Sequence, residues 1–193
     1  MSAPVFKPMS VEEYLRTEET SPYKREYVGG FVYPLHGTTR AQAGASRNHV
    51  RITVNITREL STRAQGTDCF VYSSDMKLYI EGARTFYYPD VMVVCGPTDP
   101  DAPDTYETAP CLLVEVTSRS TVRNDRHAKY QAYTALPSLQ TYLIVEQHER
   151  RVYAYHRQGR TWKLQELASS GTVDLPCLGH TLSLDDVYTG VPV

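Results

Sequence analysis

The sequence lacks the long apolar run that a membrane-spanning helix requires. Such a helix needs roughly 18 or more consecutive apolar residues, and no run in this chain of 193 residues approaches that length. The N-terminal residues also lack the basic segment followed by an apolar stretch that marks a secretion signal. We therefore expect a cytoplasmic protein with no membrane contact.

Cysteine is scarce, and its spacing matches no known motif. The four cysteines, Cys69, Cys95, Cys111 and Cys177, include no Cys-x-x-Cys pair, so metal-binding and redox motifs have little support. Cys95 and Cys111 lie in apolar stretches, where cysteine usually packs as a small buried side chain. The sequence therefore predicts packing cysteines at these two positions.

The sequence also has no excess of basic residues over acidic ones. Twenty Lys and Arg residues and 22 Asp and Glu residues give a net charge of −2. Binding to nucleic acid needs a local basic surface rather than a basic total, so this balance excludes no partner. The composition, 41% hydrophobic and 22% charged, is typical of a folded chain. Together with the length, it predicts a single domain over residues 1–193.

The most informative stretch is an apolar run that carries a single carboxylate. Residues 111–116 read Cys-Leu-Leu-Val-Glu-Val, which is typical of a central strand buried on both faces. Glu115 would then be buried, which is costly unless it is paired or bound to a cation. A helix is predicted from about residue 124 to 136, and it places Asp125 and Lys129 four residues apart on one face.

A second carboxylate precedes another predicted strand. Pro89 and Asp90 stand before the apolar run 91–94, and proline, which cannot donate a ladder hydrogen bond, belongs at the start of a strand. The loop 96–110 that follows is rich in proline, aspartate and threonine, as an exposed connection should be. An antiparallel pairing through this loop would bring Asp90 close to Glu115.

Each of these residues alone has an ordinary structural explanation. Asp90 fits a turn at the start of a strand, Glu115 fits a partnered core carboxylate, and Lys129 fits a helical ion pair with Asp125. Together, however, a carboxylate near the end of a strand and a lysine on the following helix favour a functional site over a core position. Mg²⁺ would suit such a site, because it prefers a few carboxylate oxygens together with water and substrate phosphate.

The same residues resemble the PD-(D/E)xK nuclease signature in a variant form. More closely, the chain resembles a large bacterial family of restriction-endonuclease-like proteins of unknown function. In that family a Tyr-Pro-Asp-Val segment precedes a Val-Glu-Val-x-Ser strand, a helix with Asp and Lys, and a Pro-Ser-Leu-Gln-x-Tyr-Leu segment. The corresponding positions here are 88–91, 114–118, Asp125 with Lys129, and 137–143.

The resemblance covers about residues 8–188. It implies an α/β fold of the restriction-endonuclease type, with a mixed sheet flanked by helices and with N-terminal and C-terminal hairpins. It also implies an endonuclease that depends on Mg²⁺ or Mn²⁺ and hydrolyses phosphodiester bonds of DNA. A homodimer is expected by analogy, since two-fold symmetry suits the cutting of both strands of a duplex.

The resemblance also assigns roles to residues. Asp90, Glu115 and the backbone carbonyl of Val116 would hold the metal ion, and Lys129 would act on the attacking water. Glu26 would be an auxiliary acid. An equal alternative for Glu26 is a solvated strand carboxylate paired with the neighbouring Lys24 or Arg25.

One position departs from the wider nuclease pattern. Thr117 stands where the archetype carries a lysine, so Lys129 of the following helix would have to supply the amine. The alternative function is therefore a catalytically inactive module that keeps the fold and binds nucleic acid or protein. A Lys129 side chain that points to solvent would favour this alternative.

Three further polar residues have open interpretations. Asn48 and His49 stand in the first turn of a predicted helix, where an anion could bind. The resembled family often has the reverse order, His-Asn, and a histidine without support is more often a packing or surface residue. Asp75 could support the site, but a side chain that fixes its own turn is the better expectation.

Turn and helix signals predict the other elements. They are a capped helix from Ser10 to about Thr17, a hairpin over 23–35 around Gly29 and Gly30, a helix from about Ser46 to Arg63, short strands at 69–72 and 76–80, a buried strand at 141–145 parallel to that of Glu115, a hairpin over 151–166, and a short strand and capped turn within 172–187.

Overall fold

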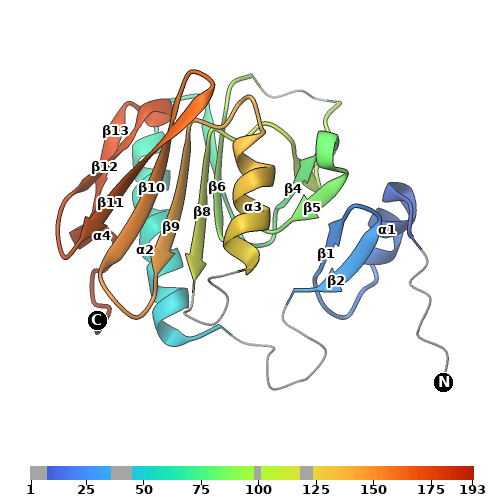
Figure 1. Cartoon of the computed structure of the whole chain (residues 1–193), viewed down its shortest axis with the longest axis horizontal. Coiled ribbons are helices and arrows are strands. Elements are labelled where there is room, and N and C mark those ends of the chain that lie inside the picture. The colour runs from blue at the N-terminus through green and yellow to red at the C-terminus, as the bar shows by residue number, and fades with distance from the viewer. Residues whose placement is uncertain (1–7, 36–44, 98–100, 118–123) are drawn as a thin grey trace.

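The protein is built on two main β-sheets (Figure 1). The computed structural model describes residues 8–35, 45–97, 101–117 and 124–193. The larger sheet has the strand order β11-β10-β9-β8-β6-β3. Its strands are β3 (Cys69–Ser73), β6 (Val91–Cys95), β8 (Leu112–Thr117), β9 (Thr141–Glu146), β10 (Arg151–Gln158) and β11 (Thr161–Ala168).

Strand β8 lies in the middle of the larger sheet, between β6 and β9. Helix α3 (Asn124–Thr134) connects β8 to β9, and the two strands run parallel, as the sequence predicted for this βαβ unit. Strand β6 is antiparallel to β8, with Val91 opposite Val114. Asp90, which precedes β6, therefore stands beside the C-terminal half of β8.

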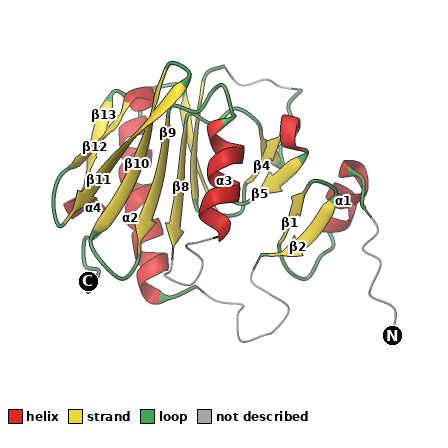
Figure 2. Ribbon diagram, viewed as in Figure 1, coloured by secondary structure: helices red, strands yellow, loops and turns green. Residues whose placement is uncertain are grey.

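The two faces of this sheet are covered by different helices (Figure 2). Helix α2 (Arg47–Ala64) packs one face with Ile52, Ile56 and Leu60, which are fully buried with Val114 of β8. Helix α3 covers the opposite face, where Tyr133 joins a separate apolar cluster. Because side chains alternate along a strand, Glu115 points toward α3.

The smaller sheet has the order β2-β1-β5-β4-β7 and packs on the N-terminal helix. An aromatic cluster of Tyr14, Tyr27 and Phe86, all fully buried, joins this helix to the sheet. Gly29 and Gly30 adopt positive φ angles of 58° and 97° at the β1–β2 turn, which favours glycine. The elements are α1 (Val11–Glu18), β1 (Arg25–Val28), β2 (Phe31–Pro34), β4 (Lys77–Ile80), the 3₁₀ helix η2 (Glu81–Ala83), β5 (Thr85–Tyr87) and β7 (Tyr106–Glu107).

The C-terminal segment forms a two-stranded sheet whose apolar residues join the core beneath α2. The Asn55 amide of α2 donates to the carbonyls of Val187 and Thr189, at 3.0 and 2.9 Å. These bonds hold the end of the chain against α2. The elements are β12 (Thr172–Leu175), the 3₁₀ helix η3 (Pro176–Leu178), β13 (His180–Ser183) and α4 (Leu184–Val187).

Most predicted elements are confirmed within a few residues of their bounds. Helix α2 differs in its apolar face, because Val50 and Val54 are 51% and 59% exposed while Asn55 is buried. Helix α3 ends at Thr134, two residues before the expected position. No helix in the described part of the chain is long and apolar enough to cross a membrane.

Candidate metal-binding site

Asp90 and the strand of Glu115 are joined by a direct hydrogen bond. The backbone N–H of Val116 donates to Oδ2 of Asp90 at 2.7 Å. The bond forms because β6 and β8 are antiparallel neighbours, which places the residue before β6 beside the end of β8. The structure thus brings together the two carboxylates that the sequence predicted to be close.

Two residues of α3 bind the carboxylate of Glu115. Lys129 Nζ lies 3.1 Å from Oε1, and the Tyr133 hydroxyl donates to the same oxygen at 2.8 Å. Lys129 and Tyr133 are four residues apart and therefore lie on one face of α3, above the strand. Both hydrogen bonds go to Oε1, so a cation at Oε2 would displace neither donor.

Glu26 reaches the same lysine from the smaller sheet. Its Oε1 lies 3.3 Å from Lys129 Nζ, so the ammonium group stands between carboxylates of β1 and β8. The alternative prediction, in which Glu26 pairs with Lys24 or Arg25, is wrong. Lys24 instead pairs with Asp75, and Arg25 pairs with Glu18.

The Lys129–Glu115 pair is buried. Lys129 is 9% and Glu115 is 8% exposed, and Lys129 points into the site rather than to solvent. Burial raises the pKa of Glu115 to about 7, although Lys129 lowers it and Asp90 raises it further. Burial opposes the charge of Lys129, but Glu115 and Glu26 raise the pKa of its ammonium well above 10.5. Lys129 is therefore protonated at neutral pH.

His49, whose role the sequence left open, is a member of this cluster. Its Nε2 lies 3.1 Å from Oδ1 of Asp90. The hydrogen bond to Asp90 raises the pKa of His49 against the opposing effect of burial, and the backbone of Val116 also contributes. Ser46 caps α2, and its Oγ accepts from the His49 N–H at 3.1 Å. The sequence feature that could have identified His49 was its position in the first turn of a predicted helix.

Asn48 and Asp75 lie away from the carboxylates. The Asn48 amide donates to the carbonyl of Gln147 at 3.1 Å, which ties the start of α2 to the end of β9. Asp75 has an 85% exposed side chain paired with Lys24, in line with the expected turn position. The side chain of Asp125 lies outside the described part of the structure.

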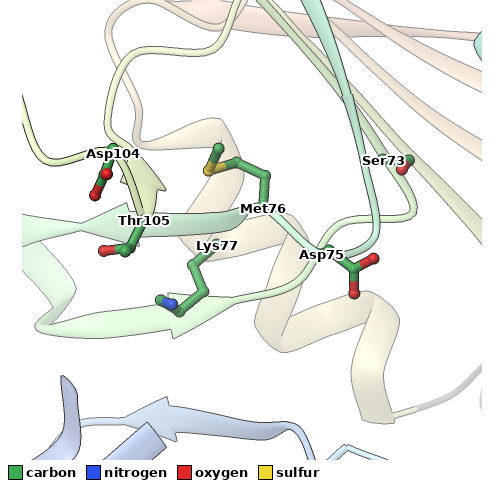
Figure 3. Close-up of a pocket in the computed structure, with 6 residues that line it drawn as sticks. All are labelled: Ser73, Asp75, Met76, Lys77, Asp104 and Thr105. Carbon is green, nitrogen blue, oxygen red and sulfur yellow. The ribbon is translucent and has the colours of Figure 1, made fainter. Parts of the chain in front are cut away.

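A separate pocket opens where the β3–β4 turn meets the segment before β7 (Figure 3). Its lining includes none of Asp90, Glu115, Lys129 and Glu26. Lys77 lines it and is half-buried, and burial lowers the pKa of its amine. Its lining consists of Ser73, Asp75, Met76, Lys77, Asp104 and Thr105.

The charges of the cluster suit a divalent cation. The cluster contains three carboxylates, those of Asp90, Glu115 and Glu26. Lys129 is the lysine that faces them, and it stays positively charged. Oε1 of Glu26 is buried, and its 3.3 Å ion pair with Lys129, which that ammonium shares with Glu115, does not have the geometry of a hydrogen bond. Buried carboxylates without full compensation favour a bound cation, and carboxylate oxygens are the ligands that Mg²⁺ prefers. The donor set therefore fits the predicted metal.

A family model described as "Uma2: Putative restriction endonuclease" matches residues 11–185. The chain belongs to this family. The uncharacterized protein slr1290 of Synechocystis sp. is 35% identical to this chain over 191 residues, covering 98% of this chain and 96% of that protein. The uncharacterized protein sll1609 of the same organism is 36% identical over 163 residues, covering 83% and 88%.

The Uma2 fold is also found in a solved structure. The crystal structure of a putative nuclease belonging to DUF820, from Anabaena variabilis, matches this chain with a TM-score of 0.72 and 14% identity. The match covers 95% of this chain and 99% of that one. The family match confirms the predicted restriction-endonuclease-like family, and the structural match confirms the mixed α/β fold.

In this chain, the amine that contacts Glu115 does not come from a lysine on β8 itself. At Thr117 the hydroxyl is buried and has no hydrogen-bond partner among the described residues. Lys129 comes from the next helix and brings its ammonium group to Glu115. The residues of the variant motif predicted from the sequence therefore lie close together in the structure.

Proposed function

We propose that this member of the Uma2 family is an endonuclease that depends on Mg²⁺ or Mn²⁺ and hydrolyses phosphodiester bonds of DNA. The position of Lys129 supports this proposal most strongly. Its buried ammonium contacts Glu115 and Glu26, and a hydrogen bond links the strand of Glu115 to Asp90. Burying these charged side chains costs free energy, and a binding module that needed only the fold would not require them.

Asp90 and Glu115 would hold the metal ion, with the carbonyl of Val116 as a third ligand and Glu26 acting through water. A bound divalent cation neutralises the phosphoryl oxygens and makes water more acidic. His49 contacts the same carboxylate group of Asp90, so a cation there competes with the imidazolium. Metal binding should therefore weaken as the pH falls and His49 becomes protonated.

Lys129 would orient the attacking water and offset negative charge at the phosphoryl group. Because its carboxylate neighbours raise the pKa of the ammonium well above 10.5, it acts as a donor and a positive charge rather than as a general base. Tyr133 donates to Oε1 of Glu115 and so would orient this carboxylate for the metal. Glu26 and Glu115 fix the ammonium from two sides.

The proposal extends to the surroundings of the enzyme. The absence of a membrane-length apolar run in the sequence supports a cytoplasmic location. Two-fold symmetry would let two sites cut the two strands of a duplex, and this supports a homodimer. Sedimentation of the protein with and without a DNA duplex would test the dimer separately from cleavage.

Cleavage of supercoiled plasmid DNA tests the proposal. Wild-type protein with Mg²⁺ or Mn²⁺ should nick or linearise the plasmid, and a chelator should stop the reaction. Asp90→Asn and Lys129→Met should each lower the rate by at least about 100-fold. Lys163→Met, which changes an exposed lysine on β11, should leave the rate unchanged.

Two results would contradict the proposal. Cleavage that survives in Asp90→Asn would place the chemistry elsewhere or in a contaminant. A wild-type protein that binds the plasmid but cuts it with neither metal would be the inactive nucleic-acid-binding module. Parallel assays with single-stranded DNA and with RNA identify the preferred polymer.

A further inference from the structure

All four cysteines meet at one place in the fold. Cys69 begins β3 and Cys95 ends β6, and they face each other across the strand pair with their Cα atoms 4.0 Å apart. Cys111 directly precedes β8, and its N–H donates to the carbonyl of Val93. Cys177 belongs to η3, in the C-terminal segment. The four side chains therefore come from four separate segments.

The sulfur atoms form one cluster rather than two distant pairs. The structure joins Cys69 to Cys95 and Cys111 to Cys177 as disulfides. The sulfurs of Cys95 and Cys111 lie 3.5 Å apart, although they belong to different disulfides. Those of Cys95, Cys111 and Cys177 all lie within 4.8 Å of one another. Two independent disulfides do not require this contact between the pairs.

Once both disulfides are reduced, the four sulfurs are near enough to form a tetrahedral thiolate site. Zinc–sulfur bonds of about 2.3 Å place the sulfurs of such a site roughly 3.8 Å apart. The 3.5 Å contact between Cys95 and Cys111 is already close to that value, and the sulfurs within each disulfide would move apart on reduction. We propose that the reduced protein binds one Zn²⁺ through Cys69, Cys95, Cys111 and Cys177.

The surroundings of the cluster fit a structural rather than a catalytic ion. Cys69 and Cys111 are 9% and 6% exposed and belong to the core under α2. The carbonyl oxygen of Cys177 lies 3.8 Å from the sulfurs of both Cys69 and Cys95, so η3 sits directly over the strand pair. Four protein ligands leave no open position for substrate, as in structural zinc sites. The ion would fasten the C-terminal segment to the larger sheet.

The chemistry balances with a thiol reductant. Each disulfide accepts two electrons and two protons from an external dithiol, which is itself oxidised to a disulfide, and the two reductions yield four thiols. Zn²⁺ then displaces four protons as four zinc–sulfur bonds form. Because thiols stay reduced in the cytosol, the zinc form would be the cellular one if the proposed cytoplasmic location holds.

Cobalt binding tests the site. The full-length protein is reduced, freed of reductant and metal without oxygen, and titrated with Co²⁺. We expect the visible d–d bands and the sulfur-to-metal charge transfer of tetrahedral cobalt thiolate at one equivalent, and their loss when Zn²⁺ is added. Asp90→Asn should give the same spectrum, because the oxygen ligands of the candidate magnesium site do not contribute these bands. Cys177→Ser should lose them.

A second measurement does not depend on a variant that folds. In the reduced wild-type protein, Zn²⁺ should protect four thiols from alkylation by iodoacetamide, counted by mass spectrometry. Alkylation that is unaffected by Zn²⁺, or a reduced protein that gives no thiolate bands with Co²⁺, would overturn the proposal and leave two disulfides as the only bonding of the cluster. Neither result bears on DNA cleavage.

Discussion

Lys129→Met removes the positive charge on which two buried carboxylates depend. Methionine keeps much of the side-chain length but leaves Glu115 and Glu26 without their cation. Removing one partner of a buried ion pair typically costs about 3–5 kcal/mol. For a chain of this size, such a loss lowers the melting temperature by roughly 6–20 °C. The effect should be measured in a chelating buffer, so that no metal compensates the charge.

The pH dependence identifies the cause of this loss. Burial raises the pKa of Glu115 from 4.5 to about 7, so ionisation of Glu115 makes the folded state less stable as the pH rises through this range. In the wild type, Lys129 offsets part of that cost and keeps its charge, since its pKa lies well above 10.5. The variant lacks this compensation. The difference in unfolding free energy should therefore grow from about 1 kcal/mol near pH 5 to the full value near pH 8.5.

Urea unfolding at the two pH values measures the difference, with Lys163→Met as the matched control. That lysine is exposed on β11, so its substitution should stay within about 0.5 kcal/mol of the wild type. A Lys129→Met protein that loses no more than the control near pH 8.5 would refute the reasoning. So would a large loss that does not change with pH.

Three other changes probe the same site. Tyr133→Phe deletes the 2.8 Å hydrogen bond to Glu115 and should lower the unfolding free energy by about 1.5–3 kcal/mol; urea midpoints within error of the wild type would contradict this. Ser46→Ala removes the cap of α2 and should cost about 1 kcal/mol in the same assay, whereas an unchanged midpoint would show that the cap is dispensable. An NMR titration of the metal-free protein should give His49 a pKa above 6.5, because Asp90 stabilises its charged form, and Asp90→Asn should lower that pKa. A value at or below 6.5 in the wild type would exclude the pairing.

Local patterns were sufficient to predict the elements and the central pair of strands. The apolar run around Glu115 and the proline before Asp90 predicted neighbouring strands, and the register of β6 and β8 confirms this. Helix α2 shows the limit of such patterns. Ile52 and Ile56 are four residues apart and share the buried face, but Val50 and Val54 are offset from them by two residues and therefore turn toward solvent.

Contacts between distant segments were harder to foresee. The pairing of His49 with Asp90 depends on how α2 packs against the sheet, and no local pattern determines this. The approach of Glu26 to Lys129 was expected only from the resemblance to the nuclease family. The cysteines show the same limit, because their ligand atoms come from four separate segments, and a search for short motifs cannot detect such a cluster.

Asp90 and Glu115 are proposed to hold a divalent cation. Calorimetric titration with Mn²⁺ measures this binding without the chemistry of cleavage, since Mn²⁺ prefers oxygen ligands to the cysteine cluster. The wild type and Asp174→Asn, which alters an exposed carboxylate on β12, should bind Mn²⁺ alike. The double variant Asp90→Asn, Glu115→Gln should show no binding heat. Binding that is equal in all three proteins would contradict the claim.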